Sequence, residues 1–418
     1  MIIWWINQYA VTPDLPGGTR HYDLAVELGR MGHHVRVFAS DVNLSLRRRT
    51  KLAGAQLYDV EDLNGVQFVW VRSAGYQRND WRRAWNMLSF SLNLLRVARH
   101  MQEDSRPDVI IGSTPHPFAA LAADYLARWC GARFVLEVRD LWPQALIDMG
   151  GLRESHPVVG VLRLLERRLY AAADRVIVLA KGAESYLAGR GVQPERLVYV
   201  PNGVHLDHFR SSADRQSNRD RFGFERFTIV YTGAHGPANA LETILQTARM
   251  VRDLPVEFVL VGDGPAKDAL LRLAKSLGVD NVRFMPPIPK REMADLLSAA
   301  DAAVITLKNA HAFSYAVSPN KLFDYMAAGL PILCAVPGEI AHMVRTAQAG
   351  FVAEPENPAD LAHAVRCLLA LPAVDRQRMG RGGRAYIEAN FDRRALARRL
   401  LRALGEGRTE SETTGLVV

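Results

Sequence analysis

The chain has 418 residues, enough for two or three domains of ordinary size, each with its own hydrophobic core. Hydrophobic residues make up 49% and charged residues 23%, a composition that is typical of a folded globular protein and excludes extensive disorder. No apolar run approaches the roughly 18 residues of a membrane-spanning helix. The net charge of +8 favours a polyanionic partner, which leaves nucleic acid, an anionic membrane surface and phosphorylated substrates open.

Cysteine usage and the first residues bear on the cellular compartment. Cys130, Cys334 and Cys367 lie too far apart for a disulfide framework or a zinc site, which is typical of a protein from a reducing cytoplasm. Residues 1–6 carry no basic segment and no small-residue cleavage site, so we expect no secretory signal peptide.

Short apolar runs rich in β-branched residues alternate with amphipathic stretches from residue 2 to residue 200. This alternation predicts a parallel sheet that is covered by helices on both faces. A turn signal at Pro201-Asn202-Gly203 ends the first set. The expected strands of this set are 2–6, 34–40, 66–72, 108–112, 133–138, 175–180 and 196–200.

The same alternation restarts after a charge-dense segment at 210–226, which predicts a second α/β domain. We therefore expect two doubly wound domains at 1–203 and 204–390, followed by a helix within 391–405 and a disordered tail at 406–418. The expected strands of the second set are 227–232, 256–261, 282–285, 302–306, 331–335 and 350–353.

Ligands of open parallel sheets bind beyond the carboxyl ends of the strands, so the turns from strand to helix are the first places to look for a site. Gly17 and Gly18 precede the helix expected at 20–31. Two glycines allow close approach of a phosphate or sugar, and the helix N-terminus favours an anion. The alternative is a loop that needs only a positive φ.

The strongest local signal is the helix that begins near Ser318 and ends at Gly329. Lys321 falls in its first turn, where the helix dipole favours an acidic residue, so a lysine there indicates a bound diphosphate. Asp324 lies on the same face and can accept hydrogen bonds from ribose hydroxyls. The alternative is a solvated lysine and a surface acid.

Three further turns carry candidate residues. Arg139 and Asp140 follow the strand at 133–138, where either a substrate or a simple surface ion pair fits. Gly262 lies in a glycine-rich turn that lacks the full dinucleotide-binding spacing. Gly233 and His235 follow the first strand of the second domain, and His235 is either a donor to a phosphate or a structural side chain.

The segment 81–100 combines an apolar stripe with flanking arginines. Trp81, Trp85, Leu88, Leu92 and Leu95 recur at spacings that place them on one helical face. Such a helix either lies in a membrane interface, with Trp81 and Trp85 as the contacts, or turns its stripe toward the core.

Several of these motifs occur in the order that is typical of one enzyme family. The chain, to about residue 405, resembles the family-four retaining glycosyltransferases. The motifs that carry the resemblance are Pro16-Gly17-Gly18, Gly32-His33-His34-Val35, Val200-Pro201-Asn202-Gly203-Val204, Val261-Gly262-Asp263-Gly264-Pro265 and Tyr325-Met326-Ala327-Ala328-Gly329-Leu330-Pro331-Ile332. The segments at 138–143 and 318–321 resemble most the bacterial surface-polysaccharide branch, which includes fucosamine transferases.

The resemblance implies a GT-B fold. Residues 1–203 would bind the acceptor, 204–390 would bind a nucleotide-sugar, and a helix at 391–405 would cross back to the first domain. It also implies transfer with retention at the anomeric carbon, with no obligatory metal and no cofactor besides the UDP-sugar donor.

The family's site residues carry over only in part. Two glutamates eight positions apart flank the donor in the family, and here Ala316 stands at the first position and Asp324 at the second, which holds the ribose. The family's arginine and lysine after the first strand of the second domain are replaced by Ala234 and the 237–240 stretch. The phosphate contacts are therefore expected to come from Lys321, His235 and Arg139, with backbone amides at Gly17-Gly18 and at the helix that begins at Ser318. Gly233, Gly262 and Asn320 are further donor-binding candidates.

The expected chemistry follows from charge. Lys321 and Arg139 would stabilise the negative charge that grows on the leaving diphosphate, and Asp140 would orient the sugar or the acceptor. The resemblance implies an N-acetylated or deoxy hexose such as N-acetylfucosamine and a lipid-linked saccharide acceptor. We expect attachment to the anionic cytoplasmic face of the inner membrane and no binding of nucleic acid. A nucleotide-sugar 2-epimerase and a non-catalytic nucleotide-sugar-binding protein are the alternatives.

Overall fold

The computed structural model describes residues 1–78, 80–148, 151–209, 213–310, 318 and 320–405. The chain divides into two compact units, one made of Met1–Pro201 with the segment that follows Asp392, and the other of Asn202–Asp392. Each unit is built around its own parallel sheet, so the predicted pair of doubly wound α/β sheets is confirmed.

The sheet of unit 1 has eight strands in the order β3-β4-β2-β1-β5-β6-β7-β8. Every neighbouring pair is parallel except β3 with β4. The strands are β1 (Ile2–Ile6), β2 (His34–Ser40), β3 (Tyr58–Leu63), β4 (Val66–Val71), β5 (Val109–Ser113), β6 (Arg133–Val138), β7 (Arg175–Val178) and β8 (Leu197–Tyr199). Sequence analysis missed β3, because Asp59, Glu61 and Asp62 give this edge strand a polar sequence without an apolar run.

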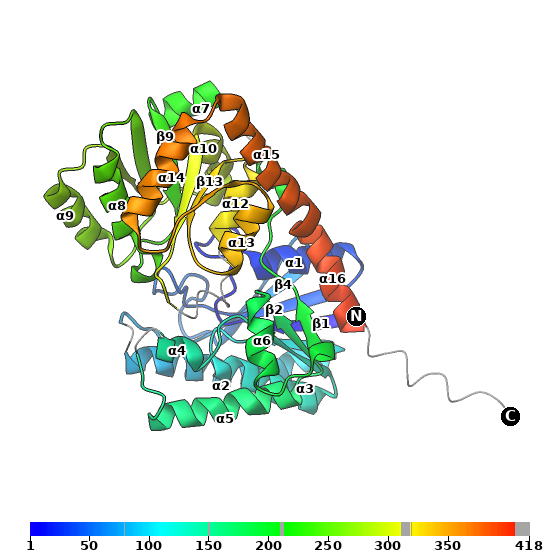
Figure 1. Ribbon diagram of the computed structural model, residues 1–418. Helices are drawn as coiled ribbons and strands as arrows, with labels where there is room; N and C mark the ends of the chain where they lie inside the picture. The colour runs from blue at the N-terminus through cyan, green and yellow to red at the C-terminus, as the bar shows by residue number, and fades with distance from the viewer. Residues whose placement is uncertain (79, 149–150, 210–212, 311–317, 319, 406–418) are drawn as a thin grey trace. The chain divides into compact units, whose positions relative to one another are not determined.

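Helices cover both faces of this sheet (Figure 1). On one face, α3 packs against both α2 and α5, and on the other face α1 packs against α16. The helices of unit 1 are α1 (Arg20–Arg30), α2 (Trp81–Asp104), α3 (Pro117–Cys130), α4 (Gln144–Asp148), α5 (Pro157–Ala172), α6 (Gly182–Ala188) and α16 (Arg393–Gly405).

The predicted return of the C-terminal helix to the first domain is confirmed. Leu396, Leu400 and Leu404 of α16 are buried in the core of unit 1 together with Leu24 and Leu28 of α1. This burial removes the apolar stripe of α16 from water, which is the main contribution that holds a short helix in place.

The sheet of unit 2 has six parallel strands in the order β11-β10-β9-β12-β13-β14. All six were predicted to within one residue. They are β9 (Phe227–Thr232), β10 (Val256–Val261), β11 (Val282–Met285), β12 (Ala302–Thr306), β13 (Ile332–Ala335) and β14 (Gly350–Val352). The helices are α7 (Arg215–Phe222), α8 (Leu241–Met250), α9 (Lys267–Leu277), α10 (Met293–Ala299), α12 (Asn320–Ala327), α13 (Glu339–Thr346), α14 (Pro358–Ala370) and α15 (Ala373–Asn390).

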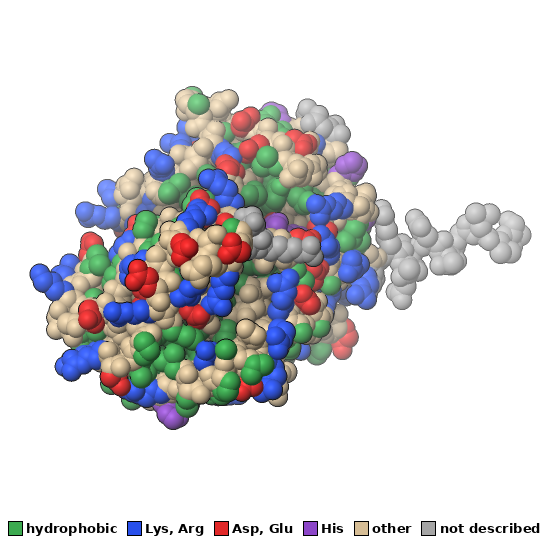
Figure 2. Space-filling model, turned by 90° about the horizontal axis from the view of Figure 1, so that it is seen from above, with side chains coloured by type: hydrophobic (Ala, Val, Ile, Leu, Met, Phe, Trp, Pro, Cys, Tyr) green, Lys and Arg blue, Asp and Glu red, His purple; other side chains and the backbone are tan. Residues whose placement is uncertain are grey.

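The charge-dense segment ahead of β9 belongs to unit 2. Its helix α7 packs on α10. Arg219 Nη1 on α7 lies 2.9 Å from the carboxylate of Asp301, which follows α10. Arg221 pairs with Glu292 in the same way. On the face of the molecule seen in Figure 2, basic side chains are likewise interspersed with acidic ones.

A buried ionic network ties the first turn of α1 to the sheet of unit 1. Glu137 on β6 accepts hydrogen bonds from Arg20 Nε at 3.1 Å and from Ser113 Oγ at 2.5 Å, and His21 Nε2 lies 2.9 Å away. Arg20 also donates to the carbonyl oxygens of Val200 and Pro201. The side chains of Arg20, His21 and Glu137 are at most 2% exposed, so this network holds charges that water cannot reach.

We predict that Glu137→Ala destabilises the protein strongly, because it leaves the Arg20 charge buried without its carboxylate. The expected loss is about 3–5 kcal/mol of unfolding free energy, measured by denaturant titration. Asp174→Ala is the matched control, since the Asp174–Arg133 pair is half exposed and its loss should stay within about 1 kcal/mol. Equal losses in the two variants would contradict the prediction.

Candidate functional site

The candidate site of unit 2 lies at the carboxyl edge of its sheet, where the strand order reverses. Strand β9 has β10 on one side and β12 on the other, which is the position at which open parallel sheets bind ligands. Gly233 follows β9, Gly262 follows β10, and Lys321 lies in the first turn of α12. The fold therefore brings these three predicted residues to one edge.

Lys321 is the central side chain of this edge. Its Nζ donates to Tyr231 Oη at 2.8 Å and to Asn239 Oδ1 at 2.8 Å, and it lies 4.4 Å from the centroid of the Tyr231 ring. Burial lowers the pKa of Lys321 to about 7. Among the described residues, no carboxylate lies within ion-pair distance of this ammonium group. A partly buried lysine without a carboxylate partner is the arrangement expected where an anionic ligand supplies the counter-charge.

Glycine is required at the two turns next to Lys321. A Cβ atom added at Gly262 would lie 1.9 Å from the carbonyl oxygen of Gly233, and one added at Gly233 would lie 3.6 Å from Lys321 Nζ. Both residues have positive φ angles, 139° at Gly233 and 150° at Gly262. The two turns can therefore pack together and leave their backbone open beside the lysine.

His235 is buried within the same turn. Its ring lies 6.2 Å from that of Tyr231 and 6.0 Å from that of Phe284, and burial lowers the pKa of the imidazole. Neither ring nitrogen has a hydrogen-bond partner among the described residues. The neutral imidazole can thus donate one hydrogen bond to a ligand, and its contact with a phosphate stays a prediction.

Asp324 and the start of α12 complete this set. Burial raises the pKa of Asp324 to about 6, although the nearby Lys290 charge opposes the shift. Ser318 Oγ and Asn320 Oδ1 are inaccessible to solvent and have no partner among the described residues, while the carbonyl oxygen of Ser318 accepts from Asn202 Nδ2 at 2.5 Å. Buried polar atoms without partners are costly, so both are candidates for ligand contacts. Ala316, at the first glutamate position, lies outside the described residues.

The four predicted residues of unit 1 lie at the carboxyl edge of its own sheet. Gly17 is exposed with φ of 144°, ahead of Gly18 and α1. The backbone NH of Arg139 donates to Thr114 Oγ1 at 3.1 Å, and this hydroxyl donates to the carbonyl oxygen of Asp140 at 3.2 Å. These bonds fix the loop after β6, and the Asp140 side chain remains exposed.

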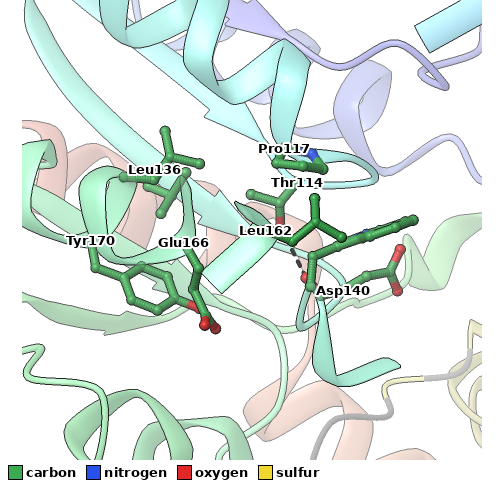
Figure 3. A pocket seen from close by; sticks show the side chains of 9 residues that line it. Thr114, Pro117, Leu136, Asp140, Leu162, Glu166 and Tyr170 are labelled. Carbon is green, nitrogen blue, oxygen red and sulfur yellow. Dashed lines mark hydrogen bonds between the residues drawn. The ribbon is translucent and has the colours of Figure 1, made fainter. Parts of the chain in front are cut away.

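A small pocket lies beside Asp140. Figure 3 shows Leu136 and Leu162 on its wall, with Thr114 near Asp140 and with Glu166 beside Tyr170. Tyr170 Oη donates to Glu166 Oε1 at 3.0 Å, so the polar groups at that end are already satisfied by each other.

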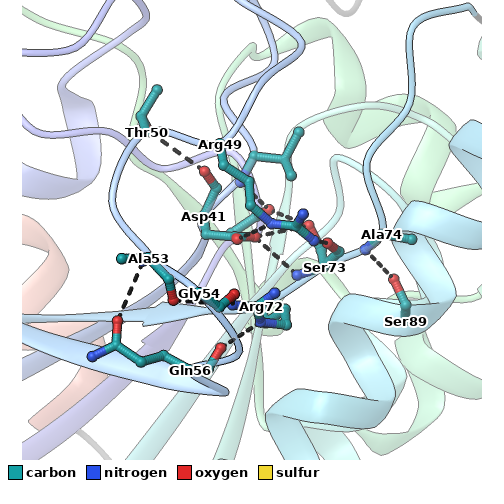
Figure 4. Close-up of polar contacts among 12 residues, drawn as sticks. Asp41, Arg49, Thr50, Ala53, Gly54, Gln56, Arg72, Ser73, Ala74 and Ser89 are labelled. Carbon is teal, nitrogen blue, oxygen red and sulfur yellow. Dashed lines mark hydrogen bonds and ion pairs between the residues drawn. The ribbon is translucent and has the colours of Figure 1, made fainter.

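Another polar cluster of unit 1 joins the loops that follow β2 and β4 (Figure 4). The buried carboxylate of Asp41 accepts from Arg49 Nε at 2.8 Å and from the backbone NH of Ser73 at 2.9 Å. Ser73 Oγ lies 2.7 Å from Ser40 Oγ. The cluster has a structural role, because it fixes two loops at the edge where a ligand would bind.

The structure thus divides the predicted site residues into two sets. Unit 2 brings seven of them to one sheet edge: Gly233, His235, Gly262, Ser318, Asn320, Lys321 and Asp324. Unit 1 holds the other four: Gly17, Gly18, Arg139 and Asp140. Sequence analysis missed Tyr231 and Asn239. Tyr231 is hidden in an ordinary apolar strand, whereas Asn239, a polar residue in the turn after β9, was a usable signal.

Comparisons with known proteins agree with this geometry. Residues 17–203 match a family model described as "Glycosyl transferase 4-like domain", and residues 226–370 match one described as "Glycosyl transferases group 1". The proposed colanic acid biosynthesis glycosyl transferase WcaI of Escherichia coli is 26% identical over 414 residues, which cover 96% of this chain and 98% of that protein.

Solved structures show the same fold. A sucrose-phosphate synthase from Thermosynechococcus elongatus superposes with a TM-score of 0.76 at 18% identity, covering 97% of this chain and 98% of that one. The Anabaena protein HepE, solved with UDP-glucose, superposes with a TM-score of 0.72 at 15% identity, covering 97% and 100%.

Two Rossmann-like units and a C-terminal helix that returns to the first unit define the GT-B fold. The matches to both halves place the chain more closely: it belongs to the group 1, family-four glycosyltransferases, a retaining family.

The lowered pKa of Lys321 makes a prediction about stability. The pKa of this amine falls from 10.5, its ordinary value, to about 7 in the folded protein, so the unfolded chain binds more protons between these values. The contribution of Lys321 to the unfolding free energy therefore rises with pH through this interval. Lys321→Met removes this amine, so its stability relative to wild type should be highest below about pH 7 and decline up to about pH 10.5, the ordinary pKa of lysine.

Unfolding titrations at several pH values would measure this difference. Lys275→Met, at an exposed position of α9, is the matched control and should show no such trend. A difference for Lys321→Met that does not change with pH would contradict the prediction.

Proposed function

We propose that the protein transfers a sugar from a UDP-sugar to a lipid-linked saccharide in the synthesis of a bacterial surface polysaccharide. The observation that carries this proposal is the Lys321 ammonium, which lies without a carboxylate partner among the described residues at the switch point of unit 2. The relation to a colanic acid transferase supports the polysaccharide pathway, and the UDP-glucose complex of HepE supports the nucleotide.

Charge on the leaving group explains the chemistry. When the bond from the anomeric carbon to the diphosphate oxygen breaks, negative charge grows on the β-phosphate. Lys321 and the backbone NH groups of the first turn of α12 can stabilise this charge. The acceptor hydroxyl then bonds to the anomeric carbon from the same face and gives its proton to the leaving phosphate. No nucleophile from the protein is needed in this scheme.

The remaining predicted residues have supporting roles in the proposal. Asp324 would accept hydrogen bonds from the ribose, and His235 would donate to a phosphate oxygen. In unit 1, Arg139 would add positive charge, Asp140 would orient the acceptor or the sugar, and the Gly17–Gly18 turn would approach the donor. The family resemblance favours an N-acetylated or deoxy hexose such as N-acetylfucosamine.

The outer face of the α2, α3 and α5 layer supports docking on an anionic membrane. Trp81 and Trp85 are 71% and 51% exposed, and the core-facing residues of α2 are instead Phe90, Leu94 and Val97. The stripe that was predicted from sequence is therefore turned toward solvent. The exposed large apolar side chains of this layer are Trp81, Trp85, Leu88, Leu92, Tyr125, Trp129, Val158, Val161 and Leu164.

This apolar surface carries basic side chains at its margins. Arg82, Arg96 and Arg99 are exposed on α2, and Arg128 and Arg168 are exposed on α3 and α5. Apolar side chains that enter the headgroup region together with arginines that meet anionic lipids give peripheral attachment. Among the described residues, no helix is both long enough and apolar enough to cross a bilayer. From this surface we propose attachment to the cytoplasmic face of the inner membrane.

We predict that Lys321→Ala lowers turnover by about 10²–10³-fold, the usual cost of removing one preorganised group that stabilises transition-state charge. The assay is acceptor-dependent release of UDP from a panel of UDP-sugars in the presence of a chelator. Asp324→Ala should mainly weaken UDP binding, and Lys275→Ala on α9 is the matched control. Near-wild-type turnover in Lys321→Ala would remove the lysine from the mechanism.

The same assay separates the proposal from its alternatives. Conversion of the nucleotide-sugar without any acceptor would indicate a 2-epimerase. Binding of UDP-sugars without turnover under any acceptor condition would indicate a non-catalytic binding protein.

We predict that replacing both Trp85 and Leu88 by serine releases the protein from vesicles of anionic lipid, because these exposed side chains would supply apolar contact with the bilayer. Co-sedimentation with such vesicles measures the bound fraction, which should fall at least several-fold. Leu271→Ser, at an exposed apolar position of unit 2, is the matched control. Unchanged sedimentation of the double variant would contradict the membrane assignment.

A further inference from the structure

A cluster of hydrogen-bond donors lies at the switch point of unit 1, and neither the family-four motifs nor the mechanism above uses it. Strand β1 has β2 on one side and β5 on the other, so the strand order reverses between β1 and β5. Tyr9 follows β1, His116 follows β5, Tyr76 follows β4, and Arg83 lies in the first turn of α2. We refer to Tyr9, Tyr76, Arg83 and His116 as the switch-point cluster.

His116 is a buried hydrogen-bond donor whose Nε2 has no acceptor among the described residues. It is 0% exposed, and its Nδ1 accepts from the backbone NH of Ala119 at 3.4 Å, so the ring proton lies on Nε2. Burial lowers the pKa of His116 to about 3, which keeps the imidazole neutral. Nε2 has no hydrogen-bond partner among the described residues. A buried N–H in this state requires an acceptor.

The two tyrosines and the arginine surround this imidazole. The Tyr9 ring lies 6.0 Å from the His116 ring, and the Tyr76 hydroxyl is buried without a partner among the described residues. The Arg83 charge acts on all three neighbours. Burial, the larger effect, raises the pKa of Tyr9 and Tyr76, and the Arg83 charge opposes this rise; burial lowers the pKa of His116, and the Arg83 charge lowers it further. Arg83 is thus the common neighbour of the cluster.

A buried amide holds these groups in place. Gln8 Nε2 donates to Asn86 Oδ1 at 2.6 Å, and Asn86 Nδ2 donates to Ser73 Oγ at 2.9 Å and to the carbonyl oxygen of Ala74 at 2.5 Å. Asn86 is 0% exposed and lies three residues after Arg83, on the same face of α2. The amide therefore connects the ends of β1 and β4 to the helix that carries the arginine.

The geometry points to the switch-point cluster as the binding site for a phosphate of the lipid-linked acceptor, an assignment that rests on the proposed function. Every side chain of the cluster can donate a hydrogen bond and one carries a positive charge, which suits a group made only of acceptor oxygens. The Asp140 carboxylate also feels the Arg83 charge, so a sugar hydroxyl next to the phosphate would reach an acceptor. Trp81 and Trp85 lie two residues before and two residues after Arg83, so the cluster and the proposed membrane-contacting surface share the N-terminal end of α2.

The test uses geranyl diphosphate as a soluble probe that combines a diphosphate with a short isoprenyl chain. Calorimetric titration of the full-length wild type should show binding. Arg83→Ala should weaken it about tenfold or more and Tyr76→Phe, which removes only the hydroxyl, about fivefold. Arg83→Lys, which keeps the charge, should recover part of the loss. Arg106→Ala, at an exposed position just after α2, is the matched control. The assignment would be overturned if wild type did not bind geranyl diphosphate. It would also be overturned if Arg83→Ala and Tyr76→Phe both bound it with the affinity of wild type.

Two further ligands identify the source of the phosphate. Inorganic pyrophosphate should bind more weakly than geranyl diphosphate. Equal affinity with the same response to the variants would mean that the site takes a free anion, and would overturn the lipid assignment. UDP should bind equally well to wild type and Arg83→Ala. Failure of wild type to bind UDP would count against the proposed function alone, whereas loss of UDP binding in Arg83→Ala would assign the cluster to the nucleotide and overturn the inference.

Discussion

The ion pair between Arg20 and Glu137 is the interaction on which the architecture of unit 1 depends. Glu137 belongs to β6, in the half of the sheet on the far side of β1 from β2, and Arg20 begins the helix that leads from β1 to β2. Arg20 also donates hydrogen bonds to the backbone carbonyls of Val200 and Pro201, at the end of the first of the two chain segments that form unit 1. Asp23, one turn further along α1, contacts Arg393 at the start of the returning helix. One helical turn therefore connects the sheet with both points at which the chain changes unit.

The two units use one architectural rule at the two ligand sites that we propose. In each, the first strand has sheet neighbours on both sides. Several buried polar atoms that have no hydrogen-bond partner among the described residues lie where the strand order reverses. In unit 2 these residues surround the Lys321 ammonium, and in unit 1 they surround the Arg83 guanidinium. An unpaired polar group is costly in the apolar interior of a sheet, whereas at the carboxyl edge it can meet solvent or a ligand.

Much of the fold could be predicted from sequence, because buried parallel strands are near-continuous apolar runs and their carboxyl ends share one edge. That reasoning located all six strands of unit 2, and the structure brings Gly233, Gly262 and Lys321 to one edge of their sheet. It missed the polar edge strand β3, whose sequence carries no apolar run. Sequence analysis could not predict which way the Trp81–Trp85 stripe faces. Helix α2 has two apolar stripes, and only packing decides which one faces the sheet.

The contacts of Lys321 could not be predicted for a related reason. Spacing placed the lysine in the first turn of a helix, but its partners Tyr231 and Asn239 come from about 80–90 residues earlier in the chain. Tyr231 looks like an ordinary strand residue, and its hydroxyl matters only because the ring points toward α12.

The lowered pKa of Lys321 has a consequence for how charge enters the site. An amine that titrates near neutrality is partly uncharged in the empty protein, so the empty site is spared much of the cost of enclosing an ammonium ion. An anionic ligand that settles beside the amine favours its protonated form, and the proton comes from the solvent with the ligand. Under the proposed function, the positive charge of this site is therefore acquired together with its counter-charge, and donor binding couples to the pH of the solution.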